Sequence, residues 1–235
     1  SVRAVLLGGT KPPQTAPGTA GDTDSLIRFA FTLTSPRFVN LIAMQKMYAG
    51  GPGVPAVDVF CPSMLDLDHW LGCPFTAASQ HDQMLLMEQI ALVSGGAILP
   101  FIGYNPRTDV QQRGASFARV IDAVCNRGFI GVKVYPPMGY LGYGNARGAG
   151  AGSCPEIEDG DAIDTALARL YAWCVAHNVP VMSHTSHSFG RTDAHEDCAT
   201  PHGWRTAIDK FSGLRVQAGH FGGASAYALE HAWAA

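Results

Sequence analysis

The sequence contains few charged residues and no concentration of either sign. Lys and Arg total 16, Asp and Glu total 19, the formal net charge is −3, and no run of basic residues occurs. A protein that binds nucleic acid usually carries a basic patch, and an anionic membrane surface also attracts basic segments. These absences argue against a nucleic-acid partner and against a membrane partner. We therefore expect a small-molecule substrate as the partner, and formation of a homo-oligomer stays open.

Long apolar runs and several common motifs are also missing. No apolar run approaches the roughly 20 residues that span a bilayer, and residues 2–9 lack a signal-peptide cleavage site. No Gly-x-Gly-x-x-Gly opens a helix after a strand, so nothing indicates a dinucleotide site. The six cysteines are dispersed without a Cys-x-x-Cys pair. We interpret them as reduced thiols of a cytoplasmic protein that has no thiolate-bound zinc.

Short apolar runs alternate along the chain with amphipathic helical patterns. The 235 residues, 47% of them hydrophobic, suffice for one α/β domain with a sizeable core, and we expect a single domain over residues 1–235. Alternation of this kind is typical of parallel βαβ units. The expected strands cover residues 57–62, 97–104, 129–137, 179–184 and 214–220. The expected helices cover residues 26–33, 36–47, 79–94, 112–127, 161–175, 203–211 and 224–233.

Polar and Gly-rich segments separate these elements. Residues 138–160 lack hydrophobic periodicity and contain many glycines, which predicts a loop of a length typical of lids or disordered segments. Residues 189–201 are expected to form a second loop. Asp66, Asp68 and His69 follow the strand at 57–62, and we interpret them as solvated loop or capping residues.

One lysine stands out because of its neighbours. Lys133 lies between Val132 and Val134 in a run that we expect to be buried on both faces of a sheet. A buried lysine costs several kcal/mol unless it is paired, neutral or chemically modified. Lys133 is therefore a candidate catalytic residue.

Two of the expected strands end in a histidine, His184 and His220. The carboxyl ends of parallel strands in barrels and open sheets carry ligands and catalytic groups. Imidazole is a common zinc ligand, and a site with three protein ligands and one open position makes a bound water acidic. His184 and His220 are thus candidate metal ligands. The alternative is that both only hydrogen-bond loop backbone at the rim of the sheet.

Three segments resemble one known family. GFIGVKVYPPMG (residues 128–139), VPVMSHT (179–185) and the segment 214–223 are similar to the amidohydrolase-related branch of the amidohydrolase superfamily, over about residues 57–223. The resemblance implies an α/β fold of the (β/α)8 TIM-barrel type. It also implies hydrolysis of a small amide, ester or lactone, or a related decarboxylation. The implied cofactor is a divalent metal, zinc or manganese, and a metal-independent lactonase stays open.

The resemblance also assigns roles by position. His184 corresponds to the ligand on the fifth strand, and His220 to the sixth-strand histidine, which is a ligand or a catalytic group. Lys133 corresponds to the fourth-strand position that is carboxylated in binuclear members. The family's His-x-His on strand one and aspartate on strand eight have no counterpart here. We therefore expect a partial barrel, strands two to six, truncated at both ends.

Two alternatives to a metal-dependent hydrolase stay open. Lys133 could act as a Schiff-base nucleophile, as in barrel aldolases, with its pKa lowered by burial. The chain could also be a non-catalytic barrel whose site is incomplete.

Overall fold

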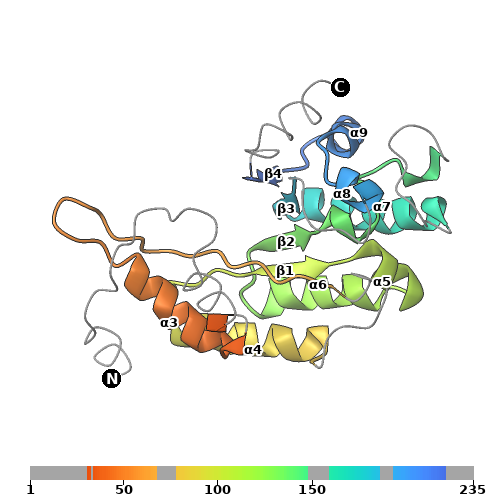
Figure 1. Cartoon of the computed structure of the whole chain (residues 1–235). Coiled ribbons are helices and arrows are strands. Elements are labelled where there is room, and N and C mark those ends of the chain that lie inside the picture. The colour runs from red at the N-terminus through yellow and green to blue at the C-terminus, as the bar shows by residue number, and fades with distance from the viewer. Residues whose placement is uncertain (1–30, 33, 68–77, 148–158, 186–192, 221–235) are drawn as a thin grey trace. The chain divides into compact units, whose positions relative to one another are not determined.

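The computed structural model describes residues 31–32, 34–67, 78–147, 159–185 and 193–220 (Figure 1). The chain divides into two compact units, Ser1–Phe60 and Cys61–Ala235. The expectation of a single domain over residues 1–235 stays a prediction. Most of the expected helix at 26–33 and all of that at 224–233 lie outside the described residues.

In the first unit, the helix expected at 36–47 is present as α3, Arg37–Met47. Pro36 immediately precedes it with φ −55° and ψ 142°, which suits proline because the first helical turns leave N–H groups unpaired. A tight turn then joins Gly51 and Val54 by an antiparallel bridge. None of the residues of α3 is buried.

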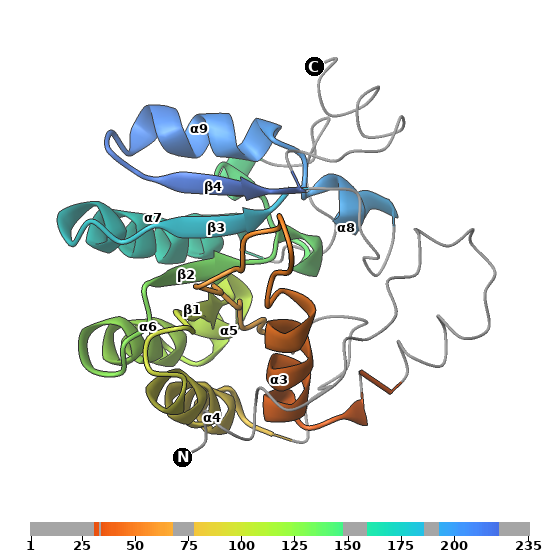
Figure 2. The same ribbon diagram turned by 90° about the vertical axis from the view of Figure 1, so that its left-hand side faces the viewer.

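The second unit contains a parallel sheet of four strands in the order β1-β2-β3-β4. The strands are β1 (Phe101–Tyr104), β2 (Gly131–Val134), β3 (Val181–His184) and β4 (Val216–Gly219). Figure 2 shows them side by side in chain order. Four of the five expected strands are thus present, each as the central part of its apolar run, and the expected α/β class is confirmed.

The first expected strand, at 57–62, is wrong as a strand. Pairing there is limited to isolated bridges, of which Ser63 to Phe101 is parallel. The amide of Phe101 donates to the Pro62 carbonyl at 2.8 Å, and the amide of Met64 donates to the Phe101 carbonyl at 2.9 Å. The segment therefore follows the edge of β1 for only a few residues. Pro62 lacks a backbone N–H and cannot donate to a ladder, which limits its extension.

Helix α4 (Gln80–Val93) precedes β1, and the other described helices of this unit lie between successive strands. These helices are α5 (Pro106–Gln111), α6 (Ala115–Asn126), α7 (Gly160–Ala176), α8 (Asp193–Asp197) and α9 (His202–Lys210), with short 3₁₀ turns η2 (Pro136–Met138) and η3 (Asn145–Arg147). Ser79 caps α4 by accepting from the Asp82 amide at 3.1 Å. Figure 2 shows α8 beyond the ends of β3 and β4 at which the arrows point.

The expected loops contain part of this structure. The helix α5 begins directly after the strand expected at 97–104. It begins there because Asn105 accepts from the Arg107 amide and Pro106 takes the first helical position. The turn η2 lies at the start of the expected loop at 138–160, and η3 lies within this loop. The helix α8 lies within the expected loop at 189–201. No helix in the described parts of the chain is both long and apolar enough to cross a bilayer.

The helices α6 and α7 cover one face of the sheet. Ile102, Val132, Val134 and Val181 are fully buried there. The hydroxyl of Tyr104, on the same face, donates to the Ala166 carbonyl of α7 at 3.2 Å. Burial of these apolar side chains is the main contribution to the stability of the second unit.

A buried carboxylate joins three of the helices. Asp109 of α5 is 1% exposed and accepts from the Phe117 amide of α6 at 2.7 Å. It also accepts from the Tyr104 hydroxyl and forms an ion pair with Arg169 of α7. Because a buried charge without such partners is costly, this network holds α5, α6 and α7 in one arrangement behind the sheet.

Candidate functional site

Lys133, Met182 and His184 lie on the face of the sheet that α7 does not cover. Successive side chains of a strand point to opposite faces. Tyr104 faces α7, and the register pairs Tyr104 with Val134, and Lys133 with Gly103 and Met182. Lys133 and Met182 therefore occupy the opposite face, and His184 follows on it, two residues beyond Met182. Two of the three candidate side chains thus share one face.

This face is concave. The hydroxyl of Ser63 donates to the sulfur of Met182 at 3.1 Å, although β1 and β2 separate the Ser63 segment from β3. In a flat sheet these positions would be about 14 Å apart, three strand spacings of about 4.8 Å. The sheet must therefore curl toward this face, as in part of a barrel, and the curvature brings strand ends together.

Lys133 is buried on this concave face without a counter-charge. Lys133 is 7% exposed. No hydrogen bond or ion pair joins its ammonium group to any residue in the described parts of the chain. Burial lowers the pKa of Lys133 from 10.5 to about 8. The amine therefore changes protonation state close to neutral pH, which suits a proton-transfer group or a nucleophile.

The imidazoles of His184 and His220 contact each other. Their ring centroids are 4.8 Å apart and the rings meet edge to face at 68°. The hydroxyl of Thr185 donates to the carbonyl of Gly219, which joins the exits of β3 and β4 just before His220. His220 itself has φ 59°, in the left-handed region that turns the chain away from the strand direction.

Gly219 allows this close approach of the two strands. A Cβ atom at Gly219 would lie 2.8 Å from the carbonyl oxygen of Ser183, well inside van der Waals contact. A larger residue would therefore push β4 away from β3 at the point where the two histidines meet.

Tyr135 is a site residue that sequence reasoning did not identify. Its ring lies against the ring of His184, with centroids 4.7 Å apart and an angle of 51°. It follows the last residue of β2, so alternation along the strand alone could have placed it beside Lys133 on the concave face. Its aromatic character alone does not indicate a site role, because tyrosines are also common in protein cores.

Asp66 also differs from its sequence interpretation. We expected a solvated carboxylate, but Asp66 is 3% exposed. Gln80 of α4 donates to the neighbouring Leu65 carbonyl at 3.0 Å and so fixes this turn in the interior. Burial raises the pKa of the Tyr140 hydroxyl, and the charge of Asp66 raises it further, which places the carboxylate near Tyr140. Asp68, His69 and His187 lie outside the described residues.

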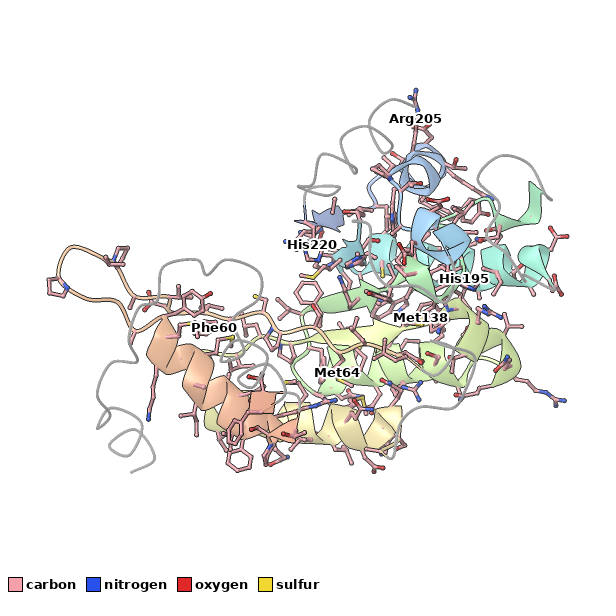
Figure 3. The ribbon with its side chains drawn as sticks, in the orientation of Figure 1. Phe60, Met64, Met138, His195, Arg205 and His220 are labelled. Carbon is pink, nitrogen blue, oxygen red and sulfur yellow. The ribbon has the colours of Figure 1, made fainter. Side chains whose placement is uncertain are left out.

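Arg107 and His195 form a second polar group beyond the ends of β1 and β2. Both reach Gly139, where a Cβ atom would lie 2.9 Å from an Arg107 guanidinium nitrogen and 2.9 Å from His195 Cδ2. Arg107 donates to the Met138 carbonyl at 3.1 Å. Figure 3 shows His195 near Met138 and apart from His220. The group therefore supports the η2 turn and does not join the histidine pair.

The histidine pair fits part of a divalent-metal site. Two adjacent imidazoles from neighbouring strand ends can both reach one ion, and imidazole is a preferred zinc ligand. Within the described ranges, however, no group of three or more His, Cys, Asp or Glu side chains could hold a metal ion. Catalytic zinc sites have three protein ligands. His184 and His220 would supply two ligands of such a site, and the described residues contain no third beside them.

Among the cysteines that the structure describes, Cys198 differs from expectation. Cys61, Cys125 and Cys174 are free thiols, but Cys198 is disulfide-bonded, so the interpretation of all six as reduced is wrong. Disulfides join residues that are distant in sequence, and spacing alone cannot reveal such a pair. Burial raises the pKa of Cys174 to about 12, which makes this thiol unreactive.

Comparison with known proteins identifies the family. A family model described as Amidohydrolase matches residues 68–235. The match includes Lys133, the strands β1 to β4 and both histidines. No curated protein and no solved structure matches the chain. The curled parallel sheet agrees with a partial TIM-barrel-like fold, and the chain belongs to the amidohydrolase family.

Proposed function

We propose that this amidohydrolase is a metal-dependent hydrolase that acts on a small carbonyl substrate, an amide, an ester or a lactone. The observation that carries the proposal is the contact between the imidazoles of His184 and His220 at adjacent strand ends. The buried Lys133 on the same concave face as His184 supports it. Family membership supports an amidohydrolase-type reaction but names no substrate and no metal.

The three side chains divide into two tasks in this proposal. His184 and His220 would hold the ion, which lowers the pKa of a bound water from 15.7 to about 7 and polarises the substrate carbonyl. Lys133, with its pKa at about 8, donates a hydrogen bond or a proton to an oxygen of the substrate. The concave face excludes water around Lys133, which strengthens that interaction.

Metal analysis together with a substrate panel tests the proposal. We expect the intact protein to bind about one zinc or manganese ion per chain and to hydrolyse at least one compound of a panel of small esters, amides and lactones. His184→Ala and His220→Ala should each lower the metal content and abolish hydrolysis. His177→Ala is the matched control, because His177 is an exposed histidine at the end of α7.

Two outcomes contradict the proposal. Hydrolysis that survives removal of all metal would leave a metal-independent lactonase. A protein that neither binds metal nor hydrolyses any panel compound would be a non-catalytic barrel.

The state of Lys133 favours a second candidate, a Schiff-base lyase. A buried amine that has no ion-pair partner among the described residues, with its pKa at about 8, is partly neutral and nucleophilic near neutral pH. Such an amine condenses with a ketone or aldehyde to an imine and releases water. Borohydride reduces the imine to a secondary amine, which stays attached to the protein.

Trapping distinguishes this candidate from the hydrolase. The intact protein is treated with borohydride and pyruvate, as a simple ketone, and then digested and analysed by mass spectrometry. The Schiff-base candidate predicts a modified peptide that contains Lys133, and no modification in Lys133→Met. Lys46, an exposed lysine of α3, serves as the internal control. Equal labelling of Lys46 and Lys133, or no labelling of either, contradicts the Schiff-base candidate.

A further inference from the structure

Three aromatic rings lie in contact one after another across the ends of β2, β3 and β4. The phenol ring of Tyr135 lies 4.7 Å from the imidazole of His184, and that imidazole lies 4.8 Å from the imidazole of His220. His184 is therefore held between two rings, one on each neighbouring strand. Aromatic pairs at such distances and tilts attract each other and restrict ring orientation.

The backbone that carries Tyr135 is itself fixed. The amide of Tyr135 donates to the hydroxyl of Tyr140 at 2.8 Å, and Tyr140 is fully buried. Tyr135 has φ −132° and ψ 81° and precedes Pro136 and Pro137, and a proline restricts the backbone of the residue before it. The ring of Tyr135 thus projects from a backbone that has little freedom to move.

Contacts with the rings of Tyr135 and His220 restrict the imidazole of His184. Its backbone is fixed in β3 by the pairing of His184 with Gly219, but the pairing does not set the rotation of the imidazole. The ring of Tyr135 limits this rotation on one side, and His220 limits it on the other. A metal ligand or a catalytic imidazole requires a defined ring plane, and the groups that set this plane govern its affinity for the ion.

We propose that Tyr135 is a positioning residue that fixes the ring plane of His184 and, through that ring, the geometry of the pair with His220. The role belongs to the ring of Tyr135, because the contact with His184 is a ring contact. The inference rests on the proposed function only where it concerns metal binding. The orientation of His184 can be measured without any metal.

Three variants separate positioning from general structural damage. Tyr135→Phe keeps the ring and removes the hydroxyl, whereas Tyr135→Leu removes the ring. Tyr143→Leu is the matched control, because Tyr143 is a buried tyrosine that packs against Phe211 and Lys210 instead of His184. Circular dichroism and thermal unfolding establish that each variant folds.

The first readout is the nuclear Overhauser contact between the imidazole C–H protons of His184 and those of His220 in the metal-free protein, with the His184 signals identified by their loss in His184→Gln. The ring plane of His184 sets the distances between these protons, and this contact does not depend on the ring current of Tyr135. We expect Tyr135→Leu to weaken the contact, and Tyr135→Phe and Tyr143→Leu to leave it unchanged. An unchanged contact in folded Tyr135→Leu overturns the inference.

The second readout is the affinity for Zn²⁺, measured by competition with a chelator. We expect Tyr135→Leu to weaken binding by about tenfold or more, with Tyr135→Phe and Tyr143→Leu close to the wild-type protein. Equal affinity in Tyr135→Leu and Tyr143→Leu would overturn the positioning role toward the metal. A wild-type protein that binds no Zn²⁺ would overturn the metal proposal alone, since the NMR readout still reports on His184.

Discussion

At the scale of single residues, Lys133 combines two features that rarely occur together. It is 7% exposed, and it has no ion-pair partner in the described parts of the chain. Burial alone lowers its pKa from 10.5 to about 8. A shift of this size corresponds to about 3 kcal/mol of destabilisation of the protonated folded state.

Replacement of Lys133 by methionine should therefore stabilise the protein in a pH-dependent way. Below about pH 8 the lysine is protonated in both the folded and the unfolded chain, and the full cost of burying the charge is present. Between about pH 8 and 10.5 the unfolded chain binds more protons, so the stability of the wild-type protein rises with pH. We expect Lys133→Met to be more stable by about 2–3 kcal/mol at pH 7 and the advantage to vanish near pH 10.5.

Denaturant unfolding at several pH values measures this difference. Lys46→Met is the control, because Lys46 is exposed, and its effect should not change with pH. A constant difference between Lys133→Met and the wild-type protein from pH 7 to 10.5 would contradict the expected protonation of a buried amine.

The sequence could predict Lys133 as a site residue but not the contact of Tyr135 with His184, for a physical reason. A charged residue between two valines violates the pattern of a buried strand, and that conflict is visible in the sequence alone. An aromatic residue at a strand end violates nothing. Its contact with His184 depends on the parallel register of β2 and β3 and on the curl of the sheet, which sequence patterns do not specify. The positive φ of His220 is equally invisible to them.

At the scale of elements, Asp164 of α7 fastens the segment that follows β2. One carboxylate oxygen accepts from the amides of Gly144 and Asn145, both at 3.0 Å, and from the Asn145 side chain at 2.8 Å. The other accepts from the Ala146 amide at 3.1 Å. Four bonds to one buried carboxylate replace the regular backbone pairing that this segment lacks.

Asp164→Ala should release this segment from α7. The change leaves buried donors without an acceptor, and each such group costs about 1–3 kcal/mol, so we expect destabilisation of about 3 kcal/mol in urea unfolding. Hydrogen exchange at residues 144–146 should become faster. Asp161→Ala is the control, because Asp161 is an exposed carboxylate in the first turn of the same helix. Equal effects of the two variants would show that Asp164 does not hold the segment.

The same elements show which parts of the fold are predictable. The helices α4 and α7 follow from strong apolar faces and good helix formers. The helix α5 was missed although Asn105 and Pro106 form a helix start, because these residues also mark a turn after a strand. The turns η2 and η3 have no periodic pattern. They depend on tertiary bonds such as those to Asp164, which the sequence cannot reveal.

At the scale of the whole molecule, the two compact units differ in how their elements are buried. The second unit has central strands β2 and β3 that are paired on both sides, and all four residues of β2 are buried. The first unit contains α3, in which no residue is buried. Isolated helices shorter than about 12–15 residues are marginally stable in water, and α3 has 11 residues.

Hydrogen exchange should therefore separate the two units. Local opening requires little free energy where few side chains are buried, and up to the global free energy of unfolding in core strands. We expect the amides of α3 to exchange orders of magnitude faster than those of β2 and β3, as measured by mass spectrometry of peptides after timed labelling. The amides of α6, an amphipathic helix with buried Val120 and Ala123, provide the internal comparison for a helix of similar length. Protection of α3 as strong as that of α6 would mean that a surface covers the apolar side chains of α3 in solution.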